Sequence, residues 1–246
     1  MSNENPDISL VIPAYNESKV IASTLNKSIS YLSVQRYDYE IVVVDDGSTD
    51  NTADLVLEFC KQYPKVKLIR NIKNKGKGFS VKRGVLFSKG NYIFFSDADL
   101  STPIAEAENL LFYFSQGYDI VVGSRALKES RITLKQPWPR QGMGKFFNLL
   151  VRLLGLSGIK DTQCGFKCFS REVAQRVFRL QRFTGFSFDV EILYIGRALG
   201  YKIKDVPITW VNRVESRVGV FRDSFTMLID LLKIKKNALI GLYNEA

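Results

Sequence analysis

Two aspartates separated by one residue follow an apolar run, and their type and spacing suit metal binding. Asp97 and Asp99 come directly after the apolar segment 92–95, which predicts a buried strand. In an open α/β sheet, ligands bind at the edge formed by the carboxyl ends of the strands. Two carboxylates at that edge suit a hard divalent cation that also binds the phosphate oxygens of a substrate. The alternative is a solvated turn after a strand.

Polar residues also follow the first apolar run. After the predicted strand at 8–12 come Pro13, Tyr15, Asn16 and Glu17. A tyrosine ring can stack on a nucleobase. The amide and the carboxylate beside it offer hydrogen bonds to a ribose or a base. The alternative is a plain strand-to-helix turn, since a carboxylate is favourable near a helix N-terminus in any case.

A second acidic pair and a glycine-lysine motif follow the next two strands. Asp45 and Asp46 end the run 40–44, where a carboxylate can accept hydrogen bonds from a base N–H or a ribose hydroxyl. The motif Asn-Lys-Gly-Lys-Gly at 74–78 opens a helix, and Lys77 beside a helix N-terminus suits a phosphate. Taken singly, these motifs are also explained by a capped turn and by a solvated surface lysine.

The composition narrows the available chemistry. The 246 residues include no histidine, which excludes histidine general bases, Ser-His hydrolases and histidine metal sites. A metal must therefore have oxygen ligands, which favours Mg²⁺ or Mn²⁺. The net charge of +10 predicts an anionic partner. A phosphorylated substrate and a membrane surface both qualify, whereas nucleic acid is disfavoured because no nucleic-acid-binding motif is present.

Cysteine usage and hydropathy indicate a compartment. Cys60, Cys164 and Cys168 are sparse and odd in number, which fits a reducing cytoplasm better than a disulfide scaffold. No uncharged apolar run reaches the roughly 18 residues that cross a bilayer. The first six residues lack the basic and apolar regions of a signal peptide. We therefore expect a cytoplasmic protein.

Short apolar runs alternate with helical patterns in the first half of the chain. The pattern predicts strands at 8–12, 41–44, 66–69, 92–95 and 120–122. Four helices are predicted. The first covers 18–32, the second begins after an N-cap at Asp50, the third covers 79–87, and the fourth runs from Thr102-Pro103 to about 115. This alternation predicts an α/β fold with a mostly parallel sheet and helices on both faces.

The pattern changes from Gly123 onward. An arginine-rich loop at 125–141 precedes an apolar helix at 146–156 and a short segment at 164–169. Helices are then predicted from Ser170 and over 188–199, followed by a strand at 201–210. The last helix, 221–243, is predicted to carry one apolar face formed by Phe221, Phe225, Leu228, Leu232 and Leu239. We divide the chain into a domain at 1–215 and a C-terminal amphipathic segment at 216–246.

Five motifs in this order and spacing resemble the inverting GT-A glycosyltransferases. They are Pro-Ala-Tyr-Asn-Glu, Val-Asp-Asp-Gly-Ser-Thr-Asp, Asn-Lys-Gly-Lys-Gly, Asp-Ala-Asp and Gly-Ser-Arg. Within that fold the chain is similar to the dolichyl- or polyprenyl-phosphate hexosyltransferases. The segments 161–167 and 188–191 most resemble the dolichyl-phosphate β-glucosyltransferases. The resemblance extends from about Ile8 to Trp210.

The resemblance implies a role for each matching residue. The nucleotide sugar would be bound by Pro13, Tyr15, Glu17, Asp45, Asp46, Lys77 and Asp97. Asp97 and Asp99 would hold Mg²⁺ or Mn²⁺ on the diphosphate. The acceptor phosphate would face Arg125 and Arg217, with Arg131 as a further candidate because guanidinium binds phosphate bidentately. The candidate catalytic residues are Asp99, Arg125 and Asp189, and for Asp189 a structural pairing with a basic residue is an equal alternative.

The leading hypothesis is transfer of glucose from UDP-glucose to a polyprenyl or dolichyl phosphate with inversion. A phosphate acceptor is already an oxyanion, so positioning can replace deprotonation. The alternatives are GDP-mannose as donor, a soluble glycan as acceptor, and a non-catalytic nucleotide-sugar-binding protein. The helix at 146–156 and the C-terminal helix would dock peripherally on the cytoplasmic membrane face, or pack on the sheet or a second subunit.

Overall fold

Strands and helices alternate along the chain in the computed structural model, which describes residues 5–133, 151, 156–211 and 222–244, with the backbone alone at 222–225. The elements are β1 (Ile8–Ala14), α1 (Ile21–Leu32), β2 (Tyr39–Asp45), α2 (Thr52–Gln62), β3 (Val66–Arg70), α3 (Lys77–Phe87), β4 (Tyr92–Ser96), α4 (Glu106–Phe114), β5 (Ile120–Ser124), β6 (Arg131–Ile132), β7 (Phe166–Ser170), α6 (Arg171–Leu180), α7 (Phe188–Ala198), β8 (Ile203–Pro207), β9 (Thr209–Trp210) and α8 (Arg222–Leu239). Each strand predicted up to residue 122 is present and reaches at least its predicted bounds.

Seven strands form one sheet in the order β3-β2-β1-β4-β7-β5-β8. Every residue of β1 and β2 is buried, as expected for central strands covered on both faces. Neighbouring strands are parallel except at β7, which runs antiparallel to β4 and β5. A separate parallel pair joins β6 to β9. The predicted α/β class with a mostly parallel sheet is confirmed.

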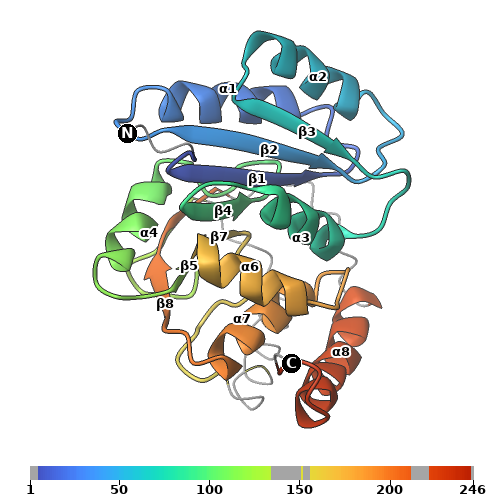
Figure 1. Cartoon of the computed structure of the whole chain (residues 1–246), viewed down its shortest axis with the longest axis vertical. Helices are drawn as coiled ribbons and strands as arrows, with labels where there is room; N and C mark the ends of the chain where they lie inside the picture. Colours follow the sequence, from blue (N-terminus) through green and yellow to red (C-terminus); the bar gives the residue numbers. More distant parts are fainter. Residues whose placement is uncertain (1–4, 134–150, 152–155, 212–221, 245–246) are drawn as a thin grey trace.

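Helices cover both faces of the sheet and enclose two apolar cores (Figure 1). Side chains of α3, α6, α7 and α8 build the core on one face. Side chains of α1, α2 and α4 build the core on the other. The β2 and β3 arrows end on the right of Figure 1, and α8 lies on that same side. This side therefore combines strand ends with the C-terminal helix.

Two helix starts differ from the sequence prediction. Helix α1 begins at Ile21 rather than 18, since the preceding residues form a turn in which the Ser18 N–H donates to the Asp50 carboxylate. Helix α4 begins at Glu106 rather than at Thr102, so the proposed N-cap was wrong. The predicted helix at 146–156 lies outside the described residues except for Val151 and Leu156.

The predicted apolar face of the last helix was wrong at Leu232 and Leu239, whereas Phe221 lies outside the described residues and the side chain of Phe225 is not described. Met227, Leu231 and Ile234 are the residues of α8 that pack into the core, whereas Leu232 and Leu239 are exposed. The proposed boundary at 215/216 falls in a part of the chain that is not described, so it stays a prediction. Among the described residues, none of the helices is long and apolar enough to cross a bilayer.

Candidate active site

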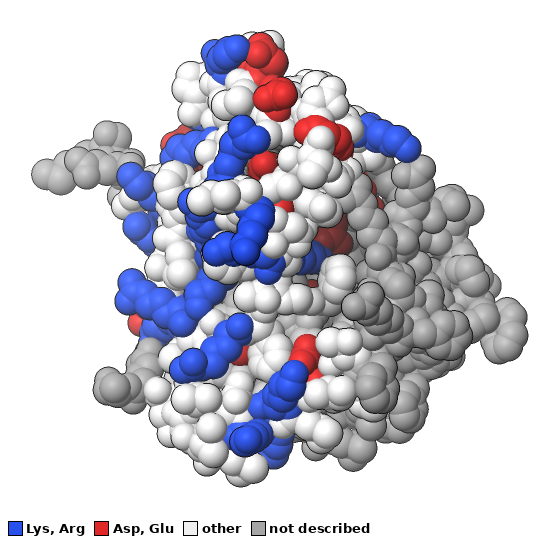
Figure 2. All heavy atoms as spheres, turned by 90° about the vertical axis from the view of Figure 1, so that its right-hand side faces the viewer, with Lys and Arg blue, Asp and Glu red and all other residues white. Residues whose placement is uncertain are grey.

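The carboxyl ends of β1, β2 and β4 and the start of α3 bring the predicted donor-site residues to one edge of the sheet. This edge lies on the right of Figure 1. Viewed from that side, Lys and Arg side chains run down the molecule, with acidic side chains among them mainly in the upper part (Figure 2). The net positive charge of the chain is thus concentrated in part where the strands end, which favours an anionic ligand there.

Asp97 and Lys77 form the most direct contact of the site. The Lys77 Nζ lies 2.6 Å from Asp97 Oδ1, and the Asp97 side chain is 40% exposed. Burial alone would lower the pKa of Lys77, but the negative charges of Asp97 and Asp189 outweigh burial and raise it. Lys77 therefore stays protonated, and the Asp97 carboxylate keeps an accessible side for a further cationic ligand.

A glycine allows the chain to pass close to the Asp97 carboxylate. A Cβ atom on Gly165 would lie 2.0 Å from Asp97 Oδ2. The Asp97 N–H also donates to the Gly165 carbonyl. No other residue type fits at this position without moving Asp97. Gly165 lies in the segment 161–167 that carries the family resemblance, but the sequence analysis gives it no role. Its contact with Asp97 joins neighbouring ends of β4 and β7, which sequence spacing does not reveal.

Asp99 is held by Ser101. The Ser101 N–H donates to Asp99 Oδ1 at 2.9 Å, and the Ser101 hydroxyl donates to Oδ2 at 2.7 Å. Leu100 between them has a φ of +48°, a left-handed conformation that is uncommon for leucine. The strained turn and the serine together fix the orientation of the Asp99 carboxylate next to Asp97 in the chain.

Asp46 ties the end of β2 to the glycine-lysine motif. Its carboxylate accepts hydrogen bonds from the Asn71 side chain and from the N–H groups of Lys75 and Gly76. The neighbouring Asp45 side chain is fully buried, accepts from the Ser48 N–H, and lies 3.5 Å from Arg70. In this arrangement Asp46 positions the loop that leads to Lys77.

The residues after β1 line the same edge. Pro13 lies in β1, and Tyr15 is 36% exposed. The Asn16 side chain accepts from the Thr49 N–H, and the Glu17 N–H donates to Thr52. These hydrogen bonds fasten the β1–α1 turn to the β2–α2 turn, and the Asp46 N–H donates to the carbonyl of Ala14, the residue before Tyr15. Their predicted contact with a nucleoside stays a prediction.

Arg125 forms an ion pair with Asp161, a residue to which the sequence analysis gives no role. Its Nε and Nη2 donate to the two oxygens of Asp161 at 2.6 and 2.9 Å, and its own N–H also donates to Asp161. The guanidinium stacks over Trp210 at 5.4 Å. Burial alone would lower the pKa of Arg125, but the Asp161 charge raises it. Two guanidinium N–H groups on Nη1 and one on Nη2 are not used by Asp161.

Asp189 is paired with the ammonium of Lys167. Both side chains are buried, and Lys167 also donates to the Cys164 carbonyl at 2.6 Å. The structural alternative raised for Asp189 is therefore observed. A lysine within the apolar segment 164–169 was the available signal for a buried charge pair.

The other two predicted arginines are not part of the described cluster. Arg131 is exposed in β6, where its backbone N–H donates to the Ile208 carbonyl. Arg217 lies outside the described residues. Their proposed contacts with an acceptor phosphate stay predictions.

The donor set fits a hard divalent cation held jointly with a ligand. Within the described ranges, no three His, Cys, Asp or Glu side chains converge on one point. The chain offers the Asp97 and Asp99 oxygens, and Mg²⁺-type ions commonly take one or two carboxylates plus substrate phosphates and water. Asp97 shares its carboxylate with Lys77, so the lysine and a cation would act on the same group.

Comparison with known proteins agrees with this architecture. Residues 9–178 match the family described as Glycosyl transferase family 2. The chain is 35% identical to the dolichyl-phosphate beta-glucosyltransferase of Dictyostelium discoideum over 99% of its own length and 79% of that protein. It is 34% identical to the Homo sapiens protein of the same name, covering 95% of this chain and 76% of that protein.

Solved structures show the fold. Glucosyl-3-phosphoglycerate synthase from Mycobacterium tuberculosis, with Mn²⁺, UDP and glucosyl-3-phosphoglycerate, superposes with a TM-score of 0.67 at 19% identity, covering 98% of this chain and 81% of that chain. The same enzyme with Mn²⁺, UDP-glucose and phosphoglyceric acid gives a TM-score of 0.69 at 20% identity, covering 94% and 80%. The GT-A fold expected from the motifs is thereby confirmed. The chain belongs to glycosyl transferase family 2 and, within it, to the group of the dolichyl-phosphate β-glucosyltransferases.

Proposed function

We propose that the chain transfers glucose from UDP-glucose to dolichyl or polyprenyl phosphate with inversion at the anomeric carbon. The relatives at about 35% identity are named dolichyl-phosphate beta-glucosyltransferases, which supports glucose as the sugar and a lipid phosphate as the acceptor. The observation that carries the chemistry is the accessible Asp97 carboxylate beside protonated Lys77. A diphosphate leaving group gains negative charge as the sugar departs, and these groups lie where that charge can be neutralised.

On the donor side, Asp97 and Asp99 would hold Mg²⁺ or Mn²⁺. The cation, when bound, acts as a Lewis acid that stabilises charge developing on the leaving diphosphate. Lys77 adds a fixed positive charge at the N-terminus of α3. Ser101 keeps the Asp99 carboxylate oriented before the donor binds, which reduces the reorganisation needed for binding.

On the acceptor side, the reaction needs an oriented phosphate rather than a base. Asp189 is neutralised by Lys167, so its carboxylate is poorly placed to remove a proton from an alcohol. A phosphate oxyanion requires no such step. Arg125 would bind it through the N–H groups that Asp161 leaves available, while Asp161 prevents the guanidinium from rotating. Arg131 and Arg217 are additional candidates for the same phosphate.

The acceptor chemistry can be tested with a matched pair of lipids. Purified protein is given labelled UDP-glucose and Mn²⁺ with dolichyl phosphate or with dolichol, which lacks the phosphate. We expect label only in the phosphorylated lipid. Equal labelling of dolichol, or of a soluble glycan, would contradict a phosphate acceptor. Repeating the assay with GDP-mannose separates the donors, because label from GDP-mannose alone would replace the sugar and keep the mechanism.

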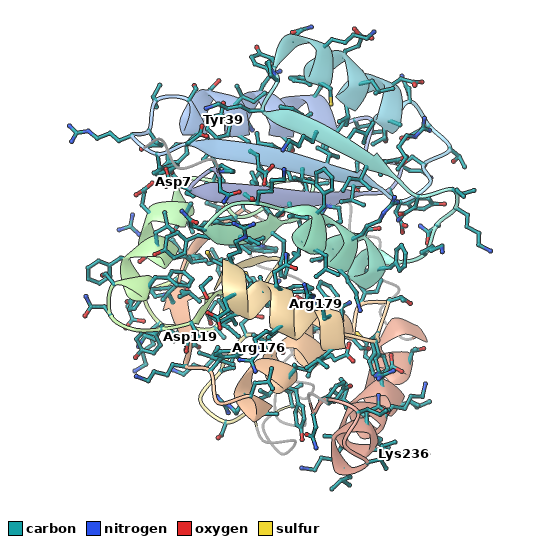
Figure 3. The ribbon with its side chains drawn as sticks, in the orientation of Figure 1. Asp7, Tyr39, Asp119, Arg176, Arg179 and Lys236 are labelled. Carbon is teal, nitrogen blue, oxygen red and sulfur yellow. The ribbon has the colours of Figure 1, made fainter. Side chains whose placement is uncertain are left out.

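The same proposal places the enzyme on a membrane surface, because its acceptor is a lipid. Ile229, Leu232, Leu239 and Ile240 are 39%, 68%, 78% and 60% exposed. Ile229, Leu232 and Leu239 lie on the side of α8 away from Met227, Leu231 and Ile234, and Ile240 follows directly after the helix. Lys235 and Lys236 are exposed on the same helix, and Lys236 extends outward from it (Figure 3). A helix face that exposes both apolar side chains and lysines suits an anionic lipid bilayer.

This surface can be tested by flotation with vesicles. Wild-type protein should float with vesicles containing phosphatidylserine, and a variant with Leu232→Asp and Leu239→Asp should not. Val34→Asp is a matched control, since Val34 is 76% exposed and belongs to the connection from α1 to the start of β2, which lies on the left of Figure 1, away from α8. A wild type that does not float would contradict the proposal. A dimer that the double substitution dissociates would make a second copy of the chain the partner of this face.

The three cysteines support a location on the cytoplasmic side of the membrane. Cys60, Cys164 and Cys168 are all free thiols, and the latter two are buried. Burial raises the pKa of Cys164 to about 11, so it stays an unreactive thiol. A reducing compartment is where such thiols are ordinarily found.

A further inference from the structure

Glu191 is a buried carboxylate that bonds to a loop rather than to a cation. It lies on α7 with no exposed surface. It accepts hydrogen bonds from the N–H groups of Arg182 and Phe183, at 3.0 and 2.8 Å. It also accepts one from the Tyr243 hydroxyl at 2.8 Å. Burial raises the pKa of Glu191, with the hydrogen bonds opposing that shift. Three donors directed at one carboxylate fix the start of the segment 181–187.

That segment packs against the first turn of α3. The Thr184 carbonyl accepts from the Phe79 N–H, and the Gln181 side chain donates to the Gly78 carbonyl at 2.9 Å. The approach is close enough that a Cβ on Gly76 would lie 2.4 Å from the Thr184 oxygen. Gly76 and Gly78 flank Lys77 in the chain. The segment 181–187 therefore supports the backbone from which Lys77 reaches Asp97.

The other side of the segment is held by α8. The Ser187 hydroxyl donates to the Asp230 carboxylate at 2.8 Å. Tyr243, just beyond α8, is only 2% exposed, and its hydroxyl donates a hydrogen bond to Glu191. Hydrogen bonds thus connect α8 and Tyr243, through Glu191 and the segment 181–187, to the backbone at Gly78 and Phe79.

We propose that Glu191 is a positioning residue for the donor diphosphate, acting through the segment 181–187, and that Tyr243 of the C-terminal region completes this support. The identity of the diphosphate ligand rests on the proposed function. Glu191 does not contact Lys77 or Asp97 itself. It sets the place of the backbone that presents them, so its loss should weaken donor binding and leave acceptor binding unaffected.

The test compares Glu191→Gln with a matched control, Glu40→Gln. Glu40 is a buried carboxylate that likewise accepts from a hydroxyl, of Ser9, and a backbone N–H, of Lys89, and it is in addition paired with Lys67. It lies on β2 near the opposite edge of the sheet. Residues that orient direct ligands typically change affinity about 10- to 100-fold when removed, and we expect Glu191→Gln to weaken UDP binding with Mn²⁺ by about 10-fold. Glu40→Gln should leave UDP binding unchanged.

A second variant and a second readout keep the test decisive. Tyr243→Phe removes one hydrogen bond and should weaken UDP binding only about 3-fold. Hydrogen exchange should accelerate at the amides of Phe79, Arg182 and Phe183 in both Glu191→Gln and Tyr243→Phe. If these amides exchange at the wild-type rate in folded Tyr243→Phe and Glu191→Gln, the inference is overturned. Equal loss of UDP binding in Glu40→Gln would reduce Glu191 to a general structural role.

Failure of this inference and failure of the proposed function give different results. A wild type that binds UDP but transfers no glucose to lipid phosphate would remove the proposed reaction, while weakened UDP binding in Glu191→Gln would still support the positioning role. Conversely, normal UDP binding and normal donor KM in Glu191→Gln, with transfer to lipid intact, would remove only the positioning role.

Discussion

The donor side and the acceptor side of the site treat their charged residues differently. On the donor side, Asp97 is 40% exposed and is paired with a partly exposed lysine. On the acceptor side, Asp161 and Asp189 are 6% and 4% exposed, and each is paired with a buried or half-buried cation. An exposed carboxylate can exchange partners when a ligand arrives, whereas a buried pair resists separation because each charge would be left uncompensated.

The difference indicates a division of labour. In the proposed function, the donor side would bind and release a charged group in each cycle. The proposed acceptor side would use charge to hold fixed geometry, since Asp161 is paired with Arg125 and Asp189 with Lys167. Substitutions on the donor side should therefore change catalysis, whereas substitutions on the acceptor side should change stability or acceptor binding.

The largest effect is expected at Asp97. Asp97→Asn keeps the shape of the side chain but removes the charge that would bind a cation and pair with Lys77. Loss of a group that stabilises transition-state charge commonly costs about 10²–10³-fold in kcat, and we expect at least this loss of glucose transfer. Circular dichroism should show an intact fold. Activity within a few-fold of wild type would remove Asp97 from the site.

The next effect is a loss of stability at the Lys167–Asp189 pair. Lys167→Met leaves Asp189 buried without its partner, which typically costs about 3–5 kcal/mol of unfolding free energy. Urea unfolding measures this loss. The double variant with Lys167→Met and Asp189→Leu should recover much of it, because no buried charge is then unpaired. A fully stable single variant would show that Asp189 is free to act in catalysis.

A smaller effect is expected at Arg125. Arg125→Lys keeps the positive charge but loses the bidentate contact with Asp161 and the planar group that would bind a phosphate. We expect KM for dolichyl phosphate to rise about 10-fold while KM for UDP-glucose stays within about 2-fold. Initial rates with each substrate varied in turn separate the two constants. An equal rise in both would erase the distinction between donor and acceptor sides.

The smallest effect concerns pH and the Arg125–Asp161 pair. Burial alone would raise the pKa of Asp161, but the charge and hydrogen bonds of Arg125 outweigh it and hold the pKa below 3.8. Because the folded pKa lies below the unfolded value, the pair stabilises the protein above about pH 4, and this contribution is lost as pH falls through the folded pKa. The urea midpoint of wild type should therefore fall more steeply from pH 5 to about 3 than that of Asp161→Asn. Parallel pH profiles would contradict this assignment.

The donor half of the fold could be predicted because its signals are local. The strands before residue 122 are apolar runs ending in polar residues, and parallel βαβ units bring such ends to one edge. The positions of five residues just beyond a strand or at the start of a helix could be predicted in this way, namely Asp45, Asp46, Lys77, Asp97 and Asp99, and their roles stay predictions.

The acceptor half depends on contacts between distant segments. Strand β7 lies between β4 and β5 and runs antiparallel to both, a pairing that the short run 166–170 does not encode by itself. The acidic partner of Arg125 lies 36 residues away, and the Tyr243 hydroxyl that donates to Glu191 lies 52 residues away. The outer face of α8 was misassigned because both sides of the helix carry apolar residues, so periodicity alone does not identify the packed side.

The central claim is tested most directly by determining the product formed from UDP-glucose, Mn²⁺ and dolichyl phosphate. The glucose of UDP-glucose is α-linked, so inversion predicts a β-glucosyl phosphate lipid, identified by its mass and by the coupling constant of the anomeric proton. An α-linked lipid product would contradict inversion. Free glucose alone, or glucose on an acceptor without phosphate, would contradict the account of the acceptor side.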